Sequence, residues 1–335
     1  MSKPRFMWAN GSQSLRLPQP RKRHVLPDGD RTPPDFMLPL PSLGERLKRP
    51  FRRVLYPFYT KAVDAWIRHR GYSKLGLEVD FWLWGQRGND YEALRRRVNR
   101  IIGIRGKQIL IAGCGTGRDI LSWLSYEPRL LTGVDYFDYA RAWKAVRDFA
   151  HKRYPRTTLT FRQADLAYMD TMPGESVDVV GSDAVFEHLR NLPAVLREFH
   201  RILRPGGVLY ATFGPLWYCW GGDHFSGHDG ILAGYNHLLL APETYEAYLC
   251  EAGPHRHSEH DGRTWIKNDL FSRLRPIEYL AALETAGFRR LEVGAIIEPR
   301  AVQCIQQSAA IRDKLLANQS LLDSVVTGMT IIYRK

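Results

Sequence analysis

The sequence predicts an α/β fold with a seven-stranded, mostly parallel sheet and helices on both faces. Three observations support this prediction. Short, almost fully apolar runs alternate with stretches of helical periodicity. A glycine-rich turn follows the first of those runs. The 335 residues are 44% hydrophobic and 25% charged, which is typical of a soluble globular chain and excludes a wholly disordered one.

Composition and periodicity divide the chain into five expected segments. They are a basic, proline-rich, irregular arm (1–50), an N-terminal helical cap (51–106), a core (107–213), an insertion (214–275) and a C-terminal part of the sheet (276–335). No run approaches the roughly 18–20 apolar residues of a membrane helix, and no apolar stretch of a secretion signal is recognised. Four scattered cysteines without a C-x-x-C pair favour a reducing, cytoplasmic compartment.

The net charge of +13 is concentrated near the N-terminus. Residues 1–60 hold 12 lysines and arginines against 4 acidic residues, together with 10 of the 20 prolines. Because proline lacks an N–H donor and restricts the residue before it, a continuous helix is not expected there. Two interpretations stay open: the arm contacts an anionic surface such as nucleic acid or a membrane, or it is a solvated tail without a partner.

The expected elements follow from the spacing of apolar residues. Buried strands are expected at Gln108–Ala112, Arg129–Val134, Thr158–Arg162, Val177–Ser182, Gly207–Phe213, Phe288–Ile297 and Gly328–Tyr333. Helices are expected at Phe51–Arg70, Tyr91–Ile102 with Asp90 as N-cap, Arg118–Ser125, Phe137–Arg153, Leu192–Leu203, Pro276–Ala286 and Val302–Leu316. In the Phe137–Arg153 helix, Trp143, Val146 and Phe149 recur at helical spacing.

The turn after the first strand carries a glycine at every second position, Gly113, Gly115 and Gly117. Glycines permit a tight strand-to-helix turn and a close approach of a ligand to the backbone. A dinucleotide fingerprint needs its third glycine where Arg118 stands, and a phosphate loop needs Gly-Lys-Ser/Thr, which is absent. The turn therefore suits a ligand with an adenosine-like part and no pyrophosphate, and it disfavours a nucleotide-linked oxidoreductase.

Polar residues end the next three strands. Asp135, 18 residues beyond Gly117, can accept hydrogen bonds from both ribose hydroxyls. Asp165 follows the third strand, where it can receive an adenine amino group. Ser182 and Asp183 end the fourth strand and are expected to line a cleft beside the reacting group. In a parallel sheet such a cleft lies at the carboxyl ends of the strands, near the reversal of strand order.

Together these segments resemble the class I S-adenosylmethionine-dependent methyltransferases, most of all their small-molecule and glycan branch. The resembling segments are Ile109–Gly117, Gly133–Asp135, Ala164–Leu166, Ser182–His188 and Leu203–Gly207. The resemblance covers about residues 90–215, and residues 275–335 by architecture alone. It implies a Rossmann-like fold with an antiparallel last strand, S-adenosyl-L-methionine as the methyl donor and 107–213 as the cofactor-binding core.

The resemblance also implies roles by position. The residues implied to contact the donor are Ala112, Gly113, Gly115 and Gly117 for the methionyl part, Asp135 for the ribose, Tyr136, Asp165 and Leu166 for the adenine, and Ser182 near the sulfonium. One position departs from the family pattern. Many members carry an acid two positions before the first glycine, where this chain has Ile111. Arg118, Asp119 or a residue of the upstream helix must then meet the methionyl amino and carboxylate groups.

An oxygen acceptor needs its proton removed by a base or a metal. His188 is the first candidate base and His224 the second; the alternative for His188 is a helix-start residue without chemistry. The loop after the fifth strand combines aromatic and polar residues, namely Trp217, Tyr218, Trp220, Asp223, His224, His228 and Asp229. These residues suit a sugar or aromatic acceptor, or they pack the insertion on the core. Five glycines in this loop argue against a helix that would align two histidines, so no metal site is expected.

The first functional hypothesis is in-line O-methylation of a sugar or another small hydroxylated metabolite, with a small-molecule or glycan acceptor as partner. The alternatives are methylation of RNA or of a phosphate-bearing or lipid-linked substrate, and a non-catalytic adaptor of the same fold. A nucleic-acid base is disfavoured because Ser182–Val185 stands where base amino methyltransferases carry Asn/Asp-Pro-Pro-aromatic. The identity of the acceptor and the oligomeric state are not predicted.

Overall fold

The computed structural model of the chain describes residues 91–117, 120–227, 229–250 and 263–335. Several sequence-based predictions lie outside these residues. They are the arm (1–50), the helix at Phe51–Arg70, the N-cap Asp90, Arg118 and Asp119 of the turn, and His228.

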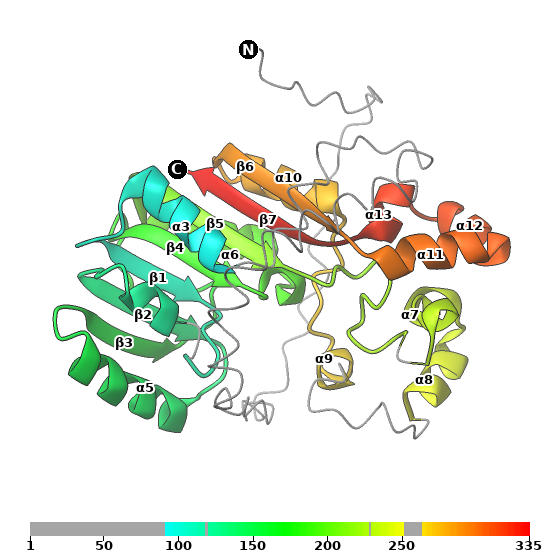
Figure 1. Cartoon of the computed structure of the whole chain (residues 1–335), viewed down its shortest axis with the longest axis horizontal. Coiled ribbons are helices and arrows are strands. Elements are labelled where there is room, and N and C mark those ends of the chain that lie inside the picture. Colours follow the sequence, from blue (N-terminus) through cyan, green and yellow to red (C-terminus); the bar gives the residue numbers. More distant parts are fainter. Residues whose placement is uncertain (1–90, 118–119, 228, 251–262) are drawn as a thin grey trace, which may run out of the picture.

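Seven strands form one sheet in the order β3-β2-β1-β4-β5-β7-β6 (Figure 1). The strands are β1 (Gln108–Ala112), β2 (Leu130–Asp135), β3 (Thr158–Gln163), β4 (Val177–Asp183), β5 (Leu203–Phe213), β6 (Arg289–Ile297) and β7 (Val326–Arg334). Strands β1 to β5 pair in parallel, and β7 runs antiparallel to both β5 and β6. The predicted Rossmann-like fold with an antiparallel last strand is confirmed.

The central strands are buried because their side chains are apolar on both faces. In β1 the last four residues are buried, and in β4 the first six are buried. Continuous apolar runs of this kind are expected where helices cover both sides of a parallel sheet. The sequence therefore located these strands to within one residue at most ends; β5 differs most, since it begins at Leu203 and not at Gly207.

Helices alternate with the strands and continue into the insertion. They are α3 (Tyr91–Ile102), α4 (Leu121–Leu124), α5 (Ala140–Arg153), α6 (Leu192–Ile202), α7 (Asn236–Leu239), α8 (Pro242–Cys250), α9 (Arg263–Lys267), α10 (Pro276–Thr285), α11 (Pro299–Gln307), α12 (Ala309–Leu316) and α13 (Leu321–Val325), with the 3-10 turns η2 (Phe186–His188) and η3 (Ile231–Ala233). The single helix expected at Val302–Leu316 is wrong: α11 ends before Ser308, whose side chain accepts from the backbone N–H of Ile311 and caps α12.

Two apolar layers enclose the sheet. On one face, α3, α4 and α5 contribute Leu94, Trp123 and Trp143 to a cluster with side chains of β1 and β4. On the other face, α6 and α10 contribute Phe199 and Tyr279 to a second cluster. Figure 1 shows α3 lying across the sheet and α5 beside its β3 edge. Among the described residues, no helix is long and apolar enough to cross a bilayer.

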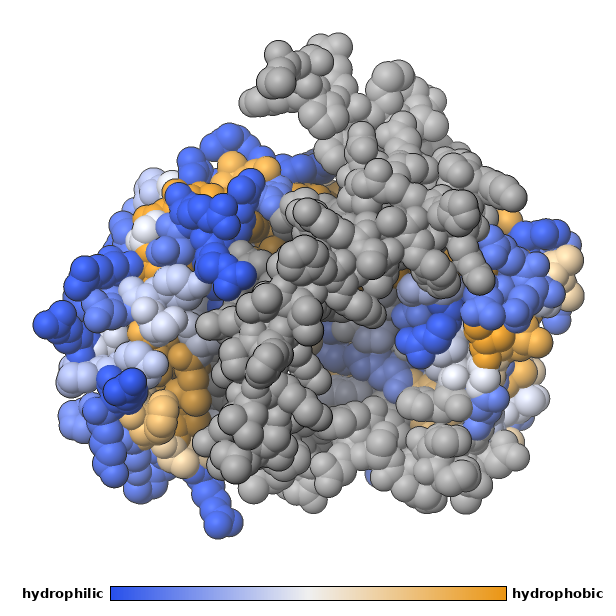
Figure 2. All heavy atoms as spheres, viewed as in Figure 1, coloured by the Kyte–Doolittle hydropathy of each residue, from blue (hydrophilic) through white to orange (hydrophobic). Residues whose placement is uncertain are grey.

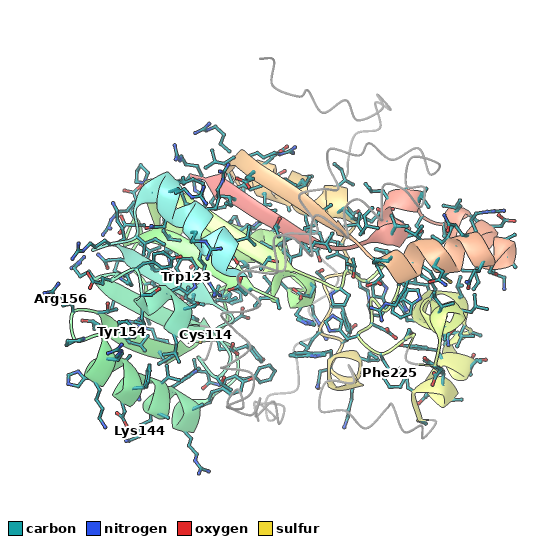
Figure 3. The ribbon with its side chains drawn as sticks, in the orientation of Figure 1. Cys114, Trp123, Lys144, Tyr154, Arg156 and Phe225 are labelled. Carbon is teal, nitrogen blue, oxygen red and sulfur yellow. The ribbon has the colours of Figure 1, made fainter. Side chains whose placement is uncertain are left out.

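Helix α5 packs through a narrower stripe than its sequence suggests. Trp143 is 5% and Ala150 1% exposed, whereas Phe149, which recurs at the same helical spacing, is 52% exposed. Phe149 lies one residue before Ala150, about 100° around the helix from the buried stripe. Lys144 projects from the outer side of α5 (Figure 3), and the described surface in Figure 2 is largely hydrophilic with smaller apolar areas.

Candidate functional site

The glycine turn leaves the carboxyl end of β1, where the strand order reverses. Strand β1 lies between β2 and β4, which makes this edge the switch point of the sheet. The backbone N–H groups of Gly113 and Cys114 donate to the carbonyl of Val134, over 2.8 and 3.1 Å. The N–H of Gly117 donates to the carbonyl of Cys114 over 2.9 Å. The turn is therefore tied to the end of β2, where Asp135 begins the next loop.

The three glycines of the turn have left-handed backbone angles and different surroundings. A Cβ on Gly113 (φ +66°) would lie 2.2 Å from Cγ2 of Val185, and one on Gly117 (φ +83°) would lie 2.8 Å from the ring of Phe161. A Cβ on Gly115 (φ +50°) would meet no described atom within 4 Å. Among the described residues, nothing crowds the backbone at Gly115, which fits the close approach that a donor nucleoside needs.

Asp135 is held against this turn by backbone donors. The N–H of Gly115 donates to Oδ2 over 2.7 Å, and the N–H of Phe137 donates to Oδ1 over 3.0 Å. The side chain is buried, and this burial raises the pKa of Asp135 above its ordinary value. The backbone of Tyr136 also interacts with this carboxylate, and because a carboxylate accepts about four hydrogen bonds, Asp135 can still accept a ribose hydroxyl.

Trp143 of α5 also binds the glycine turn, through a hydrogen bond from its indole ring. Its helical spacing in the sequence did not indicate this contact. Its Nε1–H donates to the carbonyl of Gly115 over 2.7 Å. Its ring stacks on Phe161, with centroids 5.3 Å apart and an interplanar angle of 6°. A buried indole N–H usually has a hydrogen-bond acceptor. A tryptophan on the helix that follows the second strand could therefore have been expected to donate to a backbone carbonyl nearby.

The residues implied to meet the adenine lie on the loops after β2 and β3. Asp165 is exposed, and its carboxylate accepts from the N–H of Ala167 within its own turn, over 2.8 Å. Tyr136 is half-buried with its ring edge against Phe137, at 5.4 Å between centroids. Leu166 is buried. The carboxyl ends of β2 and β3 thus bring Asp135, Tyr136, Asp165 and Leu166 to one edge of the sheet.

Ser182 and Asp183 end β4 beside the glycine turn. The hydroxyl of Ser182 donates to the carbonyl of Ala112 over 3.2 Å and is 1% exposed as a residue. Asp183 accepts from Arg95 of α3 over 2.6 Å and from the hydroxyl of Tyr210 on β5. Asp183 therefore stands at the expected edge, but within a buried ion pair that sequence reasoning did not foresee.

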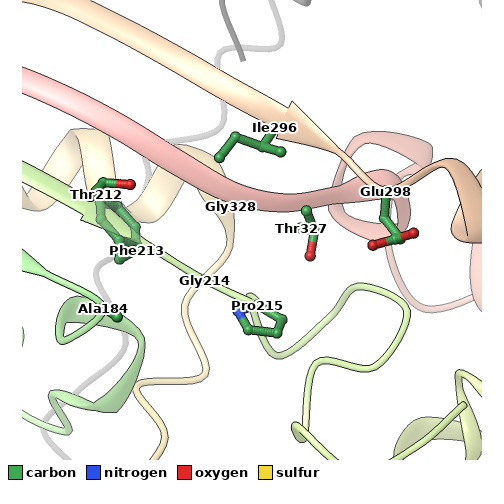
Figure 4. A pocket seen from close by; sticks show the side chains of 9 residues that line it. All are labelled: Ala184, Thr212, Phe213, Gly214, Pro215, Ile296, Glu298, Thr327 and Gly328. Atoms are coloured by element: carbon green, nitrogen blue, oxygen red, sulfur yellow. The ribbon is translucent and has the colours of Figure 1, made fainter. Parts of the chain in front are cut away.

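A pocket of about 210 Å³ opens on the next strands along the same edge (Figure 4). Its lining residues are Ala184, Thr212, Phe213, Gly214, Pro215, Ile296, Glu298, Thr327 and Gly328. Ala184 directly follows β4, and Thr212 on β5 is the register partner of Asp183, so the pocket borders the carboxyl ends of β4 and β5. The side chain of Glu298 pairs with Arg300, over 2.7 and 3.0 Å, which leaves this part of the lining close to electrically neutral.

Glu187 contacts the lining of the pocket through one of its two carboxyl oxygens. The N–H of Gly214, a lining residue, donates to its Oε1 over 3.0 Å. Its Oε2 is buried and has no hydrogen-bond partner among the described residues. Because the residue is only 2% exposed, burial raises the pKa of Glu187 to about 8. The carboxyl group is therefore largely neutral at pH 7.

The two candidate bases, His188 of η2 and His224 of the insertion, lie next to each other. The rings of His188 and His224 lie 5.0 Å apart between centroids, and His188 stacks on Trp265 at 4.4 Å. Burial lowers the pKa of His188 to about 4 and that of His224 to about 3. Both rings are consequently neutral at pH 7, which is the state that a proton acceptor requires.

Hydrogen bonding fixes how these rings present their nitrogens. Nδ1 of His188 lies 2.7 Å from the carbonyl oxygen of Leu270. A carbonyl can only accept, so Nδ1 of neutral His188 carries the proton and Nε2 has the lone pair. The Nε2 of His224 is buried without a hydrogen-bond partner among the described residues, and its ring interacts with the backbone of Pro215, which lines the pocket.

The other polar residues of the insertion hold the insertion together. Asp223 is fully buried and accepts from Ser226 N–H and hydroxyl, each over 2.7 Å, and from Tyr245 over 2.6 Å. His237, which sequence reasoning missed, lies 3.8 Å from the same carboxylate. Trp220 is 5% exposed and donates to the carbonyl of Ile231 over 2.8 Å. Asp223 and Trp220 are thus engaged in packing.

Metal-ligating side chains are not gathered in the described part of the chain. No group of three or more histidine, cysteine, aspartate or glutamate side chains with metal-binding placement occurs among the described residues. His228 lies outside them.

Comparison with known proteins agrees with this geometry. Residues 110–211 match the family model described as a methyltransferase domain. A probable S-adenosylmethionine-dependent methyltransferase of Mycolicibacterium smegmatis is 36% identical over 109 residues, 32% of this chain and 38% of that protein. Malonyl-(acyl-carrier protein) O-methyltransferase of Yersinia pestis is 29% identical over 156 residues, 44% of this chain and 54% of that protein. The chain thus spans about two fifths to one half of these relatives.

Among solved structures, an S-adenosylmethionine-dependent methyltransferase from Mesorhizobium loti aligns over 73% of this chain and 97% of its own, with 18% identity and a TM-score of 0.46. The strand order, the glycine turn at the switch point and the family match over residues 110–211 agree. This chain contains a class I S-adenosylmethionine-dependent methyltransferase domain, a family in which S-adenosyl-L-methionine is the methyl donor.

Proposed function

We propose that the protein transfers the methyl group of S-adenosyl-L-methionine to a hydroxyl oxygen of a small neutral molecule, such as a sugar. The observation that carries this proposal is the pairing of two sites at one sheet edge. The uncrowded backbone at Gly115 with Asp135 suits the donor, and the pocket at the carboxyl ends of β4 and β5 suits the acceptor. The relative from Yersinia pestis, which is named as an O-methyltransferase, agrees with oxygen as the acceptor atom.

The size and lining of the pocket support a small uncharged acceptor. Its volume of about 210 Å³ lies below the roughly 300–1,000 Å³ of sites for drug-sized ligands. Its polar groups include the hydroxyls of Thr212 and Thr327 and the Glu298 carboxylate, and no lysine or arginine lines it within the part of the chain that the structure describes. Hydroxyl and carboxylate oxygens accept hydrogen bonds from a polyhydroxylated molecule, whereas a phosphate would find no cationic side chain in the lining.

The histidine pair supports removal of the acceptor proton. Bound S-adenosyl-L-methionine would supply the methyl carbon, with its sulfur keeping the electron pair of the broken bond. Nε2 of His188 or of His224 would accept the hydroxyl proton, since both rings are neutral and each keeps Nδ1 for a backbone contact. Because their pKa values are about 4 and 3, we expect no loss of rate between pH 8 and pH 6 from protonation of this pair.

Donor binding is the first test, measured by calorimetry with S-adenosylhomocysteine. We expect wild-type protein to bind it and Asp135→Asn to weaken binding by tenfold or more, because the amide replaces one acceptor oxygen by a donor. Asp138→Asn, an exposed neighbour that bonds the N–H of Ala140, serves as the matched control and should change nothing. Equal affinity of the Asp135 variant and wild type would contradict the ribose role.

Acceptor chemistry is the second test, measured as a mass gain of one methyl group on a panel of sugars and small alcohols. We expect His188→Gln or His224→Gln to lower kcat by about 10²–10⁴-fold, the usual contribution of a general base, while donor affinity stays within twofold. His200→Gln, a partly exposed histidine of α6, is the control. Full turnover in both single variants would remove the histidine pair from the mechanism.

A further inference from the structure

Helix α5 and the turn after it carry a concentrated positive charge. The lysines and arginines of the helix are Arg141, Lys144, Arg147, Lys152 and Arg153, and its single acid is Asp148. All of these cationic residues are exposed, as is Arg156 in the turn. Figure 3 shows Lys144 and Arg156 projecting outward from this end of the molecule. The charge is therefore presented to solvent and to any partner that approaches α5.

The cations extend along the outer side of the helix. Trp143 and Ala150 are buried and mark the side that packs on the sheet. At about 100° per residue, Arg141 and Lys152 lie on the opposite side of the helix, with Lys144 nearby. At a rise of about 1.5 Å per residue, the distance along the axis from Arg141 to Lys152 is about 16 Å. The outer side of α5 is thus cationic over most of its length.

The stability of the helix explains only part of this charge. Lys152 and Arg153 lie in the last turn, where the helix dipole favours cations. Arg141 lies in the first turn, which contains no acid, and there the dipole disfavours a cation. Lys144 pairs with Asp148 over 3.0 Å, but an ion pair between exposed side chains adds little stability. The cations at the start of α5 therefore have another reason.

An exposed apolar ring accompanies the cations. Phe149 is 52% exposed. Lys152 and Arg153 follow it at spacings of three and four residues, so the three side chains are neighbours on the helix surface. Cations beside an exposed aromatic ring are typical of helices that lie on a membrane surface. There the cations attract anionic headgroups, and the ring enters the boundary with the acyl chains.

The shape of this face favours a lipid surface over a nucleic acid. Sites for single-stranded nucleic acids combine a cationic groove with several aromatic rings on which bases stack. Here the cations stand on a helix that covers β3, the strand at one end of the sheet (Figure 1). Of the two aromatic residues in α5, Trp143 is buried and Phe149 is exposed. A protruding helix with a single exposed ring can lie along a lipid surface.

We propose that α5 and the turn that ends at Arg156 dock the protein on a membrane surface rich in anionic phospholipids. The guanidinium groups pair with lipid phosphates, for which their planar fork is suited. Phe149 enters the boundary between headgroups and acyl chains. The acceptor pocket borders β4, β5 and β7, whereas α5 covers β3, so docking uses none of the residues that line the pocket. This inference does not depend on the proposed function.

Co-sedimentation of the full chain with lipid vesicles tests the proposal. We expect the protein to bind vesicles of phosphatidylglycerol mixed equally with phosphatidylcholine, and not vesicles of phosphatidylcholine alone. The triple variant Arg141→Gln, Lys144→Gln and Lys152→Gln should bind the anionic vesicles about a hundredfold more weakly, because each cation near such a surface contributes about fivefold. Phe149→Ala should also weaken binding, and its effect should persist at high salt, which screens charges but not apolar contacts.

A second triple variant, Arg197→Gln, Arg312→Gln and Lys314→Gln, is the matched control. It removes the same net charge from exposed positions on α6 and α12. It should bind anionic vesicles as wild type does. Glutamine is a good helix former, so both triple variants should fold, and an unchanged Tm verifies this. If the α5 triple variant is destabilised, Arg141→Gln alone should still weaken vesicle binding by about fivefold.

Three results would overturn the proposal. The first is that wild-type protein does not bind anionic vesicles, or that the folded α5 variant binds them as wild type does. The second is an equal loss in both triple variants, because net charge and not the face of α5 would then determine binding. The third comes from fluorescence anisotropy with an oligouridine. If the α5 variant loses oligouridine binding but keeps vesicle binding, this face is a nucleic-acid site.

Discussion

Burial and ionisation oppose each other at Glu187. The carboxyl group gains one backbone hydrogen bond, from Gly214, and its second oxygen is buried without a partner among the described residues. Desolvation disfavours the charged form, so the folded pKa of about 8 lies well above the ordinary value of 4.5. The folded protein therefore binds more protons than the unfolded chain between these two pH values.

The sign of the linkage predicts how stability depends on pH. Since the folded state holds the extra proton, the free energy of unfolding should fall as pH rises from about 4.5 toward 8. Glu187→Gln keeps the acceptor for Gly214 and cannot ionise. Relative to wild type, we expect this variant to gain about 2 kcal/mol or more between pH 5 and pH 8, because a tenfold change in acidity corresponds to about 1.4 kcal/mol.

Urea denaturation at pH 5, 6.5 and 8 measures this difference. The control is Glu284→Gln, which removes a carboxylate whose side chain is 51% exposed and paired with Arg290. A Glu187→Gln variant whose stability runs parallel to wild type across this range would show that Glu187 ionises normally in the folded protein.

Residue roles that depend on local sequence were predictable, and those that depend on distant pairing were not. Asp135 follows its strand and lies on the glycine turn, so its place could be inferred from spacing. Asp183 was expected at the same edge, but its partner Arg95 lies 88 positions away along the chain. Which of the arginines of α3 reaches it depends on how that helix packs, which no local pattern specifies.

At the scale of elements, two glycines with the same backbone angle allow the cost of steric crowding in the glycine turn to be measured separately from the cost of a left-handed backbone. Gly113 and Gly103 share a φ of +66°, but a Cβ on Gly113 would lie 2.2 Å from Val185, whereas one on Gly103 would meet no described atom within 4 Å. Alanine at either position should lower the free energy of unfolding by about 1 kcal/mol, because a residue with a Cβ is strained in the left-handed region. Gly113→Ala should lose about 1–3 kcal/mol more, the usual cost of overpacking.

Chemical denaturation of both variants separates the two effects. Equal losses in Gly113→Ala and Gly103→Ala would show that Val185 can move aside at little cost. Gly113→Ala with Val185→Ala should recover part of the additional loss, because the shortened side chain vacates the space.

The elements show why sequence patterns succeed in some places and fail in others. Strands β1 and β4 were located because helices cover both of their faces, which leaves a continuous apolar run. The break at Ser308 went unrecognised because neither glycine nor proline marks it; a serine N-cap is a weaker signal. Phe149 repeats at helical spacing in α5 yet is 52% exposed, since the sheet covers a narrower stripe than periodicity alone suggests.

At the scale of the whole molecule, the two proposed sites join segments that are remote in sequence. The donor side uses the turn at 112–117 and the end of β2, and the pocket uses Ala184, residues 212–215, Ile296, Glu298 and residues 327–328. A ligand that binds only the folded chain stabilises it by mass action, by about 2.7 kcal/mol at a concentration one hundred times Kd.

Thermal unfolding with increasing S-adenosylhomocysteine measures this linkage. We expect Tm to rise by roughly 5–10 °C at a hundredfold excess over Kd, since 1 kcal/mol shifts a domain of this size by about 2–4 °C. Asp135→Asn should need a higher ligand concentration for the same rise. Homocysteine, which lacks the nucleoside, is the control, and an equal rise with homocysteine would contradict recognition through the ribose.

The place of β7 affects how the protein is made. This strand lies between β5 and β6, although β6 precedes it in the chain. While the polypeptide is being synthesised, β6 leaves the ribosome before the strand that connects it to the sheet. The outer edge of β5 stays without its neighbour for the same interval, and an uncovered apolar edge of this kind can pair with another nascent chain. A chaperone that shields strand edges would therefore have its substrate in the interval between the synthesis of β5 and that of β7.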